Sequence, residues 1–431
     1  MAEPRKYDEK TGKRHRRKWP YRVAIAVFIV AALLLIAQDQ STLRVESPVA
    51  ASDPGFADYV ASLVGAAVEP GDTYTVLRNG EAFPPMLAAI EQAKTRINFE
   101  TYVFKEGGVG DQFLAALERA GQRGVKVKMI LDPIGSVVGE ENEKRLEKAT
   151  VQLAWFNPLR FWTLEETNYR THRKVLVVDG SVAFTGGMGI ADQWLGNAQD
   201  PDHWRDTQFE ITGPAVRALE ASFYENWIES GGRSAPALDP ELPSQPTGAR
   251  SVVLWSNPTA GASNVKLLYL LAIGAARKTL DIQSPYITLD ESTRWSLAEA
   301  RGRGVRVRML TEGEITDAMP VKHASRFGYQ PLLDQGTEIY EYQPTMMHTK
   351  AMIVDGAFSV IGSANFGNRS FELNDELTVA VFDAELAAAL VSDFEKDMQV
   401  SQQLDAATWK DERSMFGKVQ ERFWSFFGEI F

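Results

Sequence analysis

Two histidine–lysine pairs with the same spacing are the residues of this chain best suited to chemistry. Each pair belongs to a copy of the pattern H-x-K-x-x-x-x-D. The first copy contains His172, Lys174 and Asp179, and the second contains His348, Lys350 and Asp355. Because the chain has only five histidines and the flanking residues also match, the repeat indicates a duplicated functional motif.

The two motifs together predict one metal-free site for phosphodiester chemistry. Residues i and i+2 of a strand share a face, so each histidine points the same way as its lysine. One imidazole can attack an electrophile while the other protonates the leaving oxygen, and the lysines stabilise the charge of a five-coordinate phosphorus. Two histidines without carboxylate or cysteine ligands at zinc spacing make a poor metal site, so we expect neither metal nor cofactor. Asp179 and Asp355 lie at an odd offset before a glycine turn, and we expect them to brace the motif.

Repeated strand and helix patterns predict the elements that position the motifs. The pattern indicates a helix over 82–96 and a strand over 97–104, and the segment 116–132 is closely matched by 296–312 in the second half. Alternating strands and helices predict a mixed, largely parallel sheet covered by helices. The predicted fold class is therefore α/β, with two pseudo-symmetric halves that each contribute one motif.

Composition shifts divide the chain into seven predicted segments. They are a basic tail (1–22), a transmembrane helix (23–38), a linker (39–72), the first half (73–232), a connector rich in Ser, Ala and Pro (233–250), the second half (251–402) and an amphipathic aromatic tail (403–431). The aromatic tail fits either a helix packed on the domain or one that enters a lipid interface.

The N-terminus predicts attachment to a membrane. Basic residues crowd positions 5–22, and the apolar run that follows at 23–37 is just long enough to span a bilayer. A cleaved signal peptide is the alternative, but no clean cleavage site follows the run, which favours a retained anchor. The positive-inside rule then keeps the basic tail in the cytoplasm and places the later residues outside the bacterial inner membrane.

The composition also narrows the class of partner. The formal net charge is −11, whereas tight nucleic-acid binding depends on clustered Lys and Arg, so we expect no nucleic-acid partner. The chain contains no cysteine, which excludes thiol chemistry, thiolate metal sites and disulfides.

Several longer segments resemble the phospholipase D superfamily, and within it the bacterial cardiolipin synthase branch and its phospholipase D-like relatives. The resemblance runs from about 74 to 400, and the segments that carry it are FETYVF (99–104), RTHRKVLVVDGSVAFTGGMGIADQW (170–194), HWRDTQFEITGPAV (203–216), QSPYI (283–287) and HTKAMIVDGAFSVIGSANFGNRSFELNDE (348–376). It implies a two-step transfer through a phosphohistidine, with phospholipids and the membrane as partners.

The resemblance also implies roles for individual residues. His172 is the expected nucleophile and His348 the general acid and then base, although the pseudo-symmetry permits the reverse order. An acidic residue downstream of each motif orients a histidine, and the pairing can cross between halves. Glu376 would then serve His172, and Asp206 would serve His348. Besides the two lysines, the expected substrate-binding residues are Ser363, Asn365, Gly187, Tyr102 and Tyr286. For the two tyrosines a core position is equally compatible.

The chain departs from the family pattern at one site position and in its N-terminus. Gly189 stands where many relatives have asparagine, which predicts a less symmetric site, and one span is predicted where many cardiolipin synthases carry two. The favoured function is a phosphatidyltransferase that forms cardiolipin. A phospholipase D, a membrane-tethered phosphodiesterase or nuclease, and a non-catalytic scaffold remain alternatives, and the intact motifs argue against the scaffold.

Overall fold

The structure is a computed structural model that describes residues 42–158, 168–233, 247–258 and 264–428. The chain divides into two units, residues 1–43 and 44–431, and all the elements below lie in the second. The predicted membrane span at 23–38 and most of the predicted connector at 233–250 lie outside the described residues. Within the described ranges, no helix combines the length and the apolar character needed to cross a bilayer.

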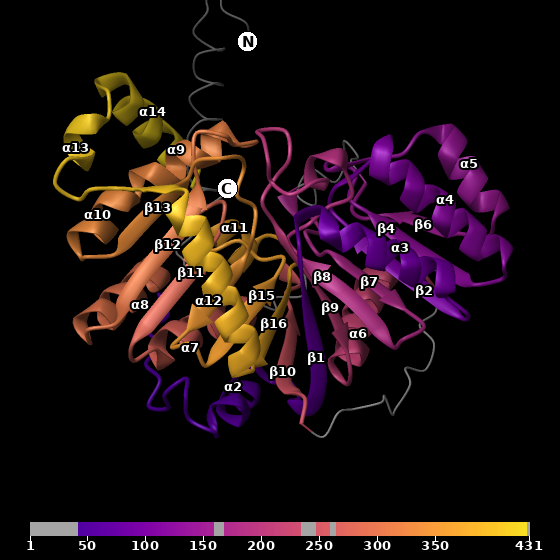
Figure 1. Cartoon of the computed structure of the whole chain (residues 1–431), viewed down its shortest axis with the longest axis horizontal. Helices are drawn as coiled ribbons and strands as arrows, with labels where there is room; N and C mark the ends of the chain where they lie inside the picture. Colours follow the sequence, from indigo (N-terminus) through magenta and orange to yellow (C-terminus); the bar gives the residue numbers. More distant parts are fainter. Residues whose placement is uncertain (1–41, 159–167, 234–246, 259–263, 429–431) are drawn as a thin grey trace, which may run out of the picture. The chain divides into compact units, whose positions relative to one another are not determined.

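Strands and helices alternate through the first half, as the sequence predicts (Figure 1). Its elements are β1 (Glu69–Arg78), η1 (Asn79–Ala82), α3 (Phe83–Gln92), β2 (Arg96–Thr101), β3 (Phe104–Lys105), α4 (Gly108–Gln122), β4 (Lys126–Leu131), β5 (Ser136–Val137), α5 (Glu140–Lys148), β6 (Gln152–Trp155), β7 (Val175–Val178), β8 (Val182–Gly186), η3 (Asp192–Trp194), β9 (Thr207–Thr212) and α6 (Ala215–Glu229).

The second half repeats this order and adds a C-terminal extension. Its elements are β10 (Ala249–Trp255), α7 (Asn264–Ala275), β11 (Thr279–Gln283), α8 (Glu291–Gly302), β12 (Arg306–Glu312), α9 (Met319–Phe327), α10 (Tyr329–Asp334), β13 (Glu338–Tyr342), β14 (Ala351–Val354), β15 (Phe358–Gly362), α11 (Asn368–Glu372), β16 (Leu377–Phe382) and α12 (Ala384–Gln399). The extension comprises β17 (Ser401–Gln403), α13 (Trp409–Glu412) and α14 (Met415–Ser425).

The strands of both halves form one continuous mixed sheet in the described residues. Its order is β17-β13-β12-β11-β14-β15-β16-β10-β1-β9-β8-β7-β2-β4-β6. Outward from the antiparallel pair β1–β10, each half continues with the same run of antiparallel strands and then with parallel ones. This matching order confirms the predicted α/β fold and its internal duplication. The prediction of a largely parallel sheet is wrong, because in the described sheet only the pairs β2–β4, β4–β6, β11–β12 and β12–β13 are parallel and the other neighbours are antiparallel.

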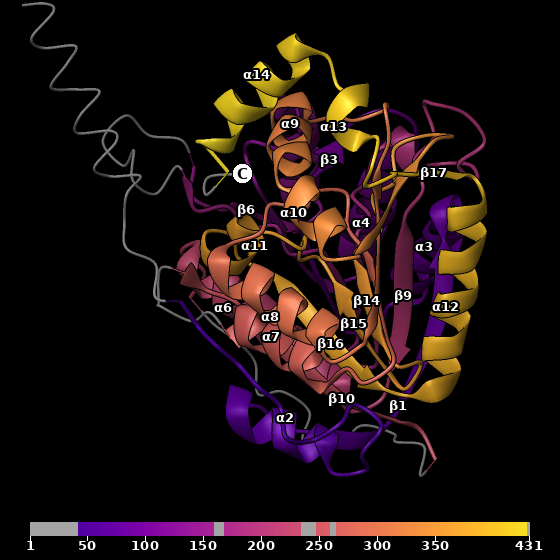
Figure 2. The same ribbon diagram turned by 90° about the vertical axis from the view of Figure 1, so that its left-hand side faces the viewer.

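Helices cover both faces of the sheet and enclose the core. In Figure 2, α7 and α8 lie on one side of the sheet and α12 lies on the other. One apolar cluster fills the space under α3 and α4, and another lies under α7 and α8. A third cluster joins Val175 and Phe223 of the first half to Ile353 and Leu390 of the second. The two halves therefore share a core, which fixes the ends of β7 and β14 relative to each other.

Two segments outside the duplicated halves belong to the same unit. The predicted linker contains α2 (Phe56–Val64), and its Phe56 and Val60 are fully buried in the core of the second half. Helix α14 buries Glu421, which forms an ion pair with Arg413, but leaves Phe416 71 % exposed. The tail is thus held through its polar side, and its apolar side faces outward.

Candidate active site

The two H-x-K motifs meet at the ends of their strands, in one cavity of about 700 Å³. His172 and Lys174 lie directly before β7, and His348 and Lys350 lie directly before β14. All four side chains are at least nine-tenths buried. The cavity is also lined by three of the expected substrate-binding residues, Tyr102, Tyr286 and Asn365.

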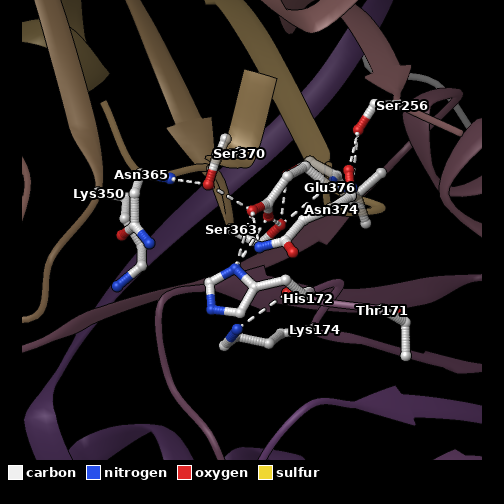
Figure 3. Close-up of polar contacts among 12 residues, drawn as sticks. Thr171, His172, Lys174, Ser256, Lys350, Ser363, Asn365, Ser370, Asn374 and Glu376 are labelled. Carbon is white, nitrogen blue, oxygen red and sulfur yellow. Dashed lines mark hydrogen bonds and ion pairs between the residues drawn. The ribbon is translucent and has the colours of Figure 1, made fainter. Parts of the chain in front are cut away.

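His172 is held by residues of the second half (Figure 3). Its backbone amide donates to the carbonyl of Asp375 at 2.8 Å, which brings the next residue, Glu376, against the imidazole. The His172 Nδ1 atom lies 3.0 Å from both carboxylate oxygens of Glu376. Ser363 and Ser370 each donate a hydroxyl to Glu376, at 2.5 and 2.6 Å. Because an ionised carboxylate only accepts hydrogen bonds, Nδ1 carries the proton and Nε2 keeps its lone pair.

His348 is held in the same way by residues of the first half. Its amide donates to the carbonyl of Arg205 at 2.7 Å, and its Nδ1 lies 2.8 Å from Oδ2 of Asp206. The Trp194 indole also donates to this oxygen, at 2.9 Å, and the Trp204 ring lies 5.3 Å from the imidazole, centroid to centroid. The crossed pairing of acid and histidine that the family resemblance implies is therefore present in the structure.

Burial and the neighbouring charges set the protonation of the site. Burial lowers the pKa of His172 to about 4, although Glu376 opposes the shift. Burial alone would raise the pKa of Glu376, but His172 and Lys174 hold it at about 2. Burial, followed by the charge of Lys350, lowers the pKa of Lys174 to about 7, and burial lowers that of Lys350 to about 8. Near neutral pH, the site thus combines a neutral, nucleophilic imidazole with an ionised partner.

The two aspartates of the motifs lie at the far ends of β7 and β14 from the histidines. Asp179 accepts from the backbone amides of Lys94, Thr95 and Arg96 at 2.8–3.0 Å, at the start of β2. Asp355 accepts in the same way from residues 277–279, at the start of β11. Both have a left-handed φ and precede a glycine, as a tight hairpin turn requires. Their position fits bracing of the strands and gives them no contact with the histidines.

The two remaining expected residues, Ser363 and Gly187, and the departure at Gly189 show how the halves differ. Ser363 is fully buried, donates its hydroxyl to Glu376, and is not among the residues that line the cavity. A Cβ atom on Gly187 would lie 2.2 Å from Oδ1 of Asp206, so Gly187 makes room for that acid. A Cβ atom on Gly189 would lie 2.7 Å from the side chain of Val103. This crowding explains the missing asparagine.

The two tyrosines line the cavity and are not core residues. The Tyr102 ring lies 5.2 Å from the His172 ring, and the Lys174 ammonium lies 5.7 Å from the Tyr102 centroid. The Tyr286 hydroxyl donates to Asp317, which also lines the cavity. Burial raises the pKa of both phenols, so neither is a base near neutral pH.

Sequence reasoning missed the residues that hold the two acids. Trp194 and Ser370 donate to Asp206 and Glu376, and both lie the same number of residues after their histidine. Asn79 and Ser256 accept from the backbone amides of the same two acids and precede the corresponding helices α3 and α7. An alignment of the two halves could have located these pairs, although a tryptophan and a serine share no chemical signature.

Comparison with known proteins agrees with this geometry. A family model described as "Cardiolipin synthase, PLD-like domain" matches residues 86–227 and 269–398. Cardiolipin synthase 1 of Bacillus anthracis is 30 % identical over 393 residues, which cover 88 % of this chain and 77 % of that protein. The cardiolipin synthase of Geobacillus kaustophilus is 32 % identical over 381 residues, 87 % of this chain and 76 % of that protein.

One solved structure shows the likeness of the fold. The crystal structure of phosphatidylserine synthase from Haemophilus influenzae Rd KW20 matches with a TM-score of 0.66 and 13 % identity, over 87 % of this chain and 97 % of that chain. The duplicated fold, the paired motifs and the sequence matches agree. The chain belongs to the phospholipase D-like family of cardiolipin synthases and is an enzyme of the phospholipase D superfamily.

Proposed function

We propose that this enzyme is a membrane-bound phosphatidyltransferase that forms cardiolipin, with phosphatidylglycerol as donor. One observation carries the proposal. Two buried histidines face a single cavity, each with Nδ1 on a carboxylate from the opposite half and each followed by a buried lysine. This arrangement suits the transfer of a phosphoryl-linked group between two oxygen atoms.

In the first step, His172 is the nucleophile. Its Nε2 attacks the donor phosphorus, a P–N bond forms, and the bond from phosphorus to the glycerol oxygen breaks. His348 gives its Nε2 proton to the leaving glycerol, and the negative charge of the bound phosphodiester favours this protonated form. Lys174 and Lys350 stabilise the charge on the phosphoryl oxygens.

In the second step, the hydroxyl of a second phosphatidylglycerol attacks the phosphohistidine. His348 takes the hydroxyl proton, the new P–O bond forms, and the P–Nε2 bond to His172 breaks. The carboxylate of Glu376 stabilises His172 in each charged state through Nδ1. The products are cardiolipin and the free glycerol of the first step.

A product assay tests the function and the order of the histidines. Solubilised protein is incubated with phosphatidylglycerol and glycerol, and the lipids are analysed by mass spectrometry. His172→Ala and His348→Ala should abolish turnover, whereas His323→Ala on α9 should retain it as the matched control. Phosphatidic acid without cardiolipin would instead identify a phospholipase D. When the reaction is stopped within one turnover, labelled donor should leave a phosphohistidine on His172 of the unaltered enzyme and none in the His172→Ala protein.

We also propose that the enzyme is a single-pass protein of the bacterial inner membrane. The predicted span at 23–38 would leave the N-terminus in the cytoplasm and the catalytic unit outside it, since the basic residues precede the span. A reporter active only in the periplasm, fused after residue 431, should be active. Activity from a cytoplasmic reporter alone would contradict this topology.

A further inference from the structure

Two arginines line the cavity on the His172 side of the histidine pair. They are Arg170 and Arg369, and the positive charge of each opposes the burial that raises the pKa of Tyr102, whose ring lies against that of His172. Arg170 also forms an ion pair with the buried Asp132, at 3.5 Å. The acidic side chains on the lining are Asp202 and Asp317, and the charge of Asp317 acts on both His348 and Tyr102.

The duplication shows that this asymmetry is not part of the shared chemistry. When the two halves are aligned in sequence so that His172 matches His348, Arg170 matches Met346 and Arg369 matches Gln193. The same alignment matches Trp194 with Ser370, which perform the same task at the two acids. The histidines and lysines are duplicated, but the two arginines occur on one side alone. A function specific to that side is therefore needed to account for them.

Both arginines are positioned by elements that also build the reaction centre. Arg170 lies two residues before His172 and donates to the backbone carbonyls of Asn157 and Tyr169, both at 2.7 Å. Arg369 lies on α11 beside Ser370 and donates to the side-chain and backbone oxygens of Asn168, at 3.2 and 3.1 Å. The two guanidinium groups are thus fixed near the phosphoryl site. Burial lowers the pKa of Arg369, Tyr102 and Glu376 oppose the shift, and the charge of Arg170 adds to it, so a further anion beside the two guanidinium groups would be stabilised.

We propose that Arg369 and Arg170 bind the phosphodiester of the acceptor phosphatidylglycerol. The inference rests on the proposed function, which brings two anionic lipids into one site. The donor phosphate lies between the histidines and lysines, so the acceptor phosphate needs a second cationic site about one glycerol away. Planar guanidinium groups bind phosphate with directed, charge-assisted hydrogen bonds. With its phosphate held there, the acceptor can direct its free hydroxyl at the phosphohistidine.

The test compares an anionic and a neutral acceptor in the same reaction. Solubilised full-length protein receives phosphatidylglycerol as donor together with 1-butanol, and cardiolipin and phosphatidylbutanol are quantified by mass spectrometry. Monoacylglycerol replaces butanol in a second series, as a neutral acceptor that is also a lipid. The readout is the ratio of cardiolipin to the neutral product, because loss of donor binding lowers both products together.

Arg369→Gln, which copies Gln193, should lower this ratio about 10- to 100-fold, the loss expected for hydrogen bonds to a charged group. Arg369→Lys keeps the charge and should lower it less, and Gln193→Ala should leave it unchanged. Formation of phosphatidylbutanol by Arg369→Gln also shows that the variant is folded. An unchanged ratio in Arg369→Gln, or an equal fall in Gln193→Ala, would overturn the inference. If the unaltered protein makes only the neutral product, the proposed function fails as well.

Discussion

Replacing Glu376 with glutamine removes one buried charge and nearly preserves the shape of the side chain. The glutamine amide would face His172, Ser363 and Ser370, all of which donate hydrogen bonds to the carboxylate in the structure. An amide has only one acceptor oxygen, so at least one of these donors must turn away or meet the NH₂ group. The easiest adjustment moves the imidazole proton from Nδ1 to Nε2. That tautomer has no lone pair at the attacking nitrogen.

The expected loss of activity in Glu376→Gln follows from the surroundings of the Glu376 carboxylate. The pKa of Glu376 falls from 4.5 to about 2, which corresponds to roughly 3 kcal/mol of favourable interaction with its neighbours. His172 is the main cause of this lowered pKa and Lys174 shares in it, so losing the carboxylate's charge slows formation of the cationic His172 by about 10- to 10²-fold. The unfavourable tautomer adds to this, so we expect kcat to fall about 10²- to 10⁴-fold; the upper end is the loss seen when the aspartate behind a catalytic histidine is replaced by asparagine.

The assay is cardiolipin formation from phosphatidylglycerol, with circular dichroism and thermal unfolding to verify the fold. Glu385→Gln makes the same chemical change at an exposed position of α12 and should leave activity unaltered. Trapping of the labelled phosphohistidine should slow in Glu376→Gln in proportion to kcat. Activity within about threefold of the unaltered enzyme would refute the role assigned to Glu376, since even the charge term alone predicts a larger loss.

The structure supports three further predictions. The pH profile of kcat/KM should rise through about 4, where His172 loses the proton that blocks its attack. It should fall again as His348 loses the proton that it gives to the leaving glycerol; burial lowers the pKa of His348, so this fall begins below the pH at which Lys174 and Lys350 lose their charge, about 7 and 8. An acid limb near the ordinary histidine pKa would contradict this. Gly187→Ala should displace Asp206 and so lower activity at least about tenfold. It should also lower the free energy of unfolding, measured by chemical denaturation, by ~1–3 kcal/mol. If both the activity and the free energy of unfolding are unchanged, Asp206 has room to move. Phe416→Ser with Phe423→Ser, on the exposed face of α14, should reduce turnover of lipid in vesicles about fivefold and leave detergent-dispersed lipid within twofold. Equal effects in both would show that α14 does not contact lipid.

The fold could be predicted where the sequence repeats itself, and the ends of elements could not. Segments 116–132 and 296–312 form the same helix and strand in both halves, as their matching patterns indicate. The helix predicted over 82–96 ends at Gln92, because the amides of residues 94–96 donate to Asp179. Asp179 lies far along the chain, in the turn between β7 and β8. Local periodicity carries no information about such a contact. The same arrangement recurs after α7, where the amides of residues 277–279 donate to Asp355.

The site could be predicted as far as its chemistry is duplicated. The spacing within each motif and the acids after it locate the reacting groups, because both halves contain them. The contact between Ser363 and Glu376 could not be predicted: the hydroxyl donates to the carboxylate, and Ser363 is not among the residues that line the cavity. Side-chain direction at a strand end depends on the partner strand, which a single motif does not specify. The same limit applies to Arg369, whose neighbour Asn168 lies in the other half.

Fusion of the two halves in one chain explains how a pseudo-symmetric site can treat its two sides differently. Each half supplies a histidine and the acid for the other half's histidine, so neither half contains a complete site. Once the halves are covalently joined, each can change independently. Behind His348, Asp206 lies against Gly187 and accepts a hydrogen bond from the Trp194 indole. Behind His172, Glu376 accepts hydrogen bonds from Ser363 and Ser370. A symmetric dimer of identical halves could not place two arginines beside one histidine without placing them beside both. A reaction that joins two anionic lipids at one phosphorus needs that difference, because one lipid is bound covalently while the other must be held by charge.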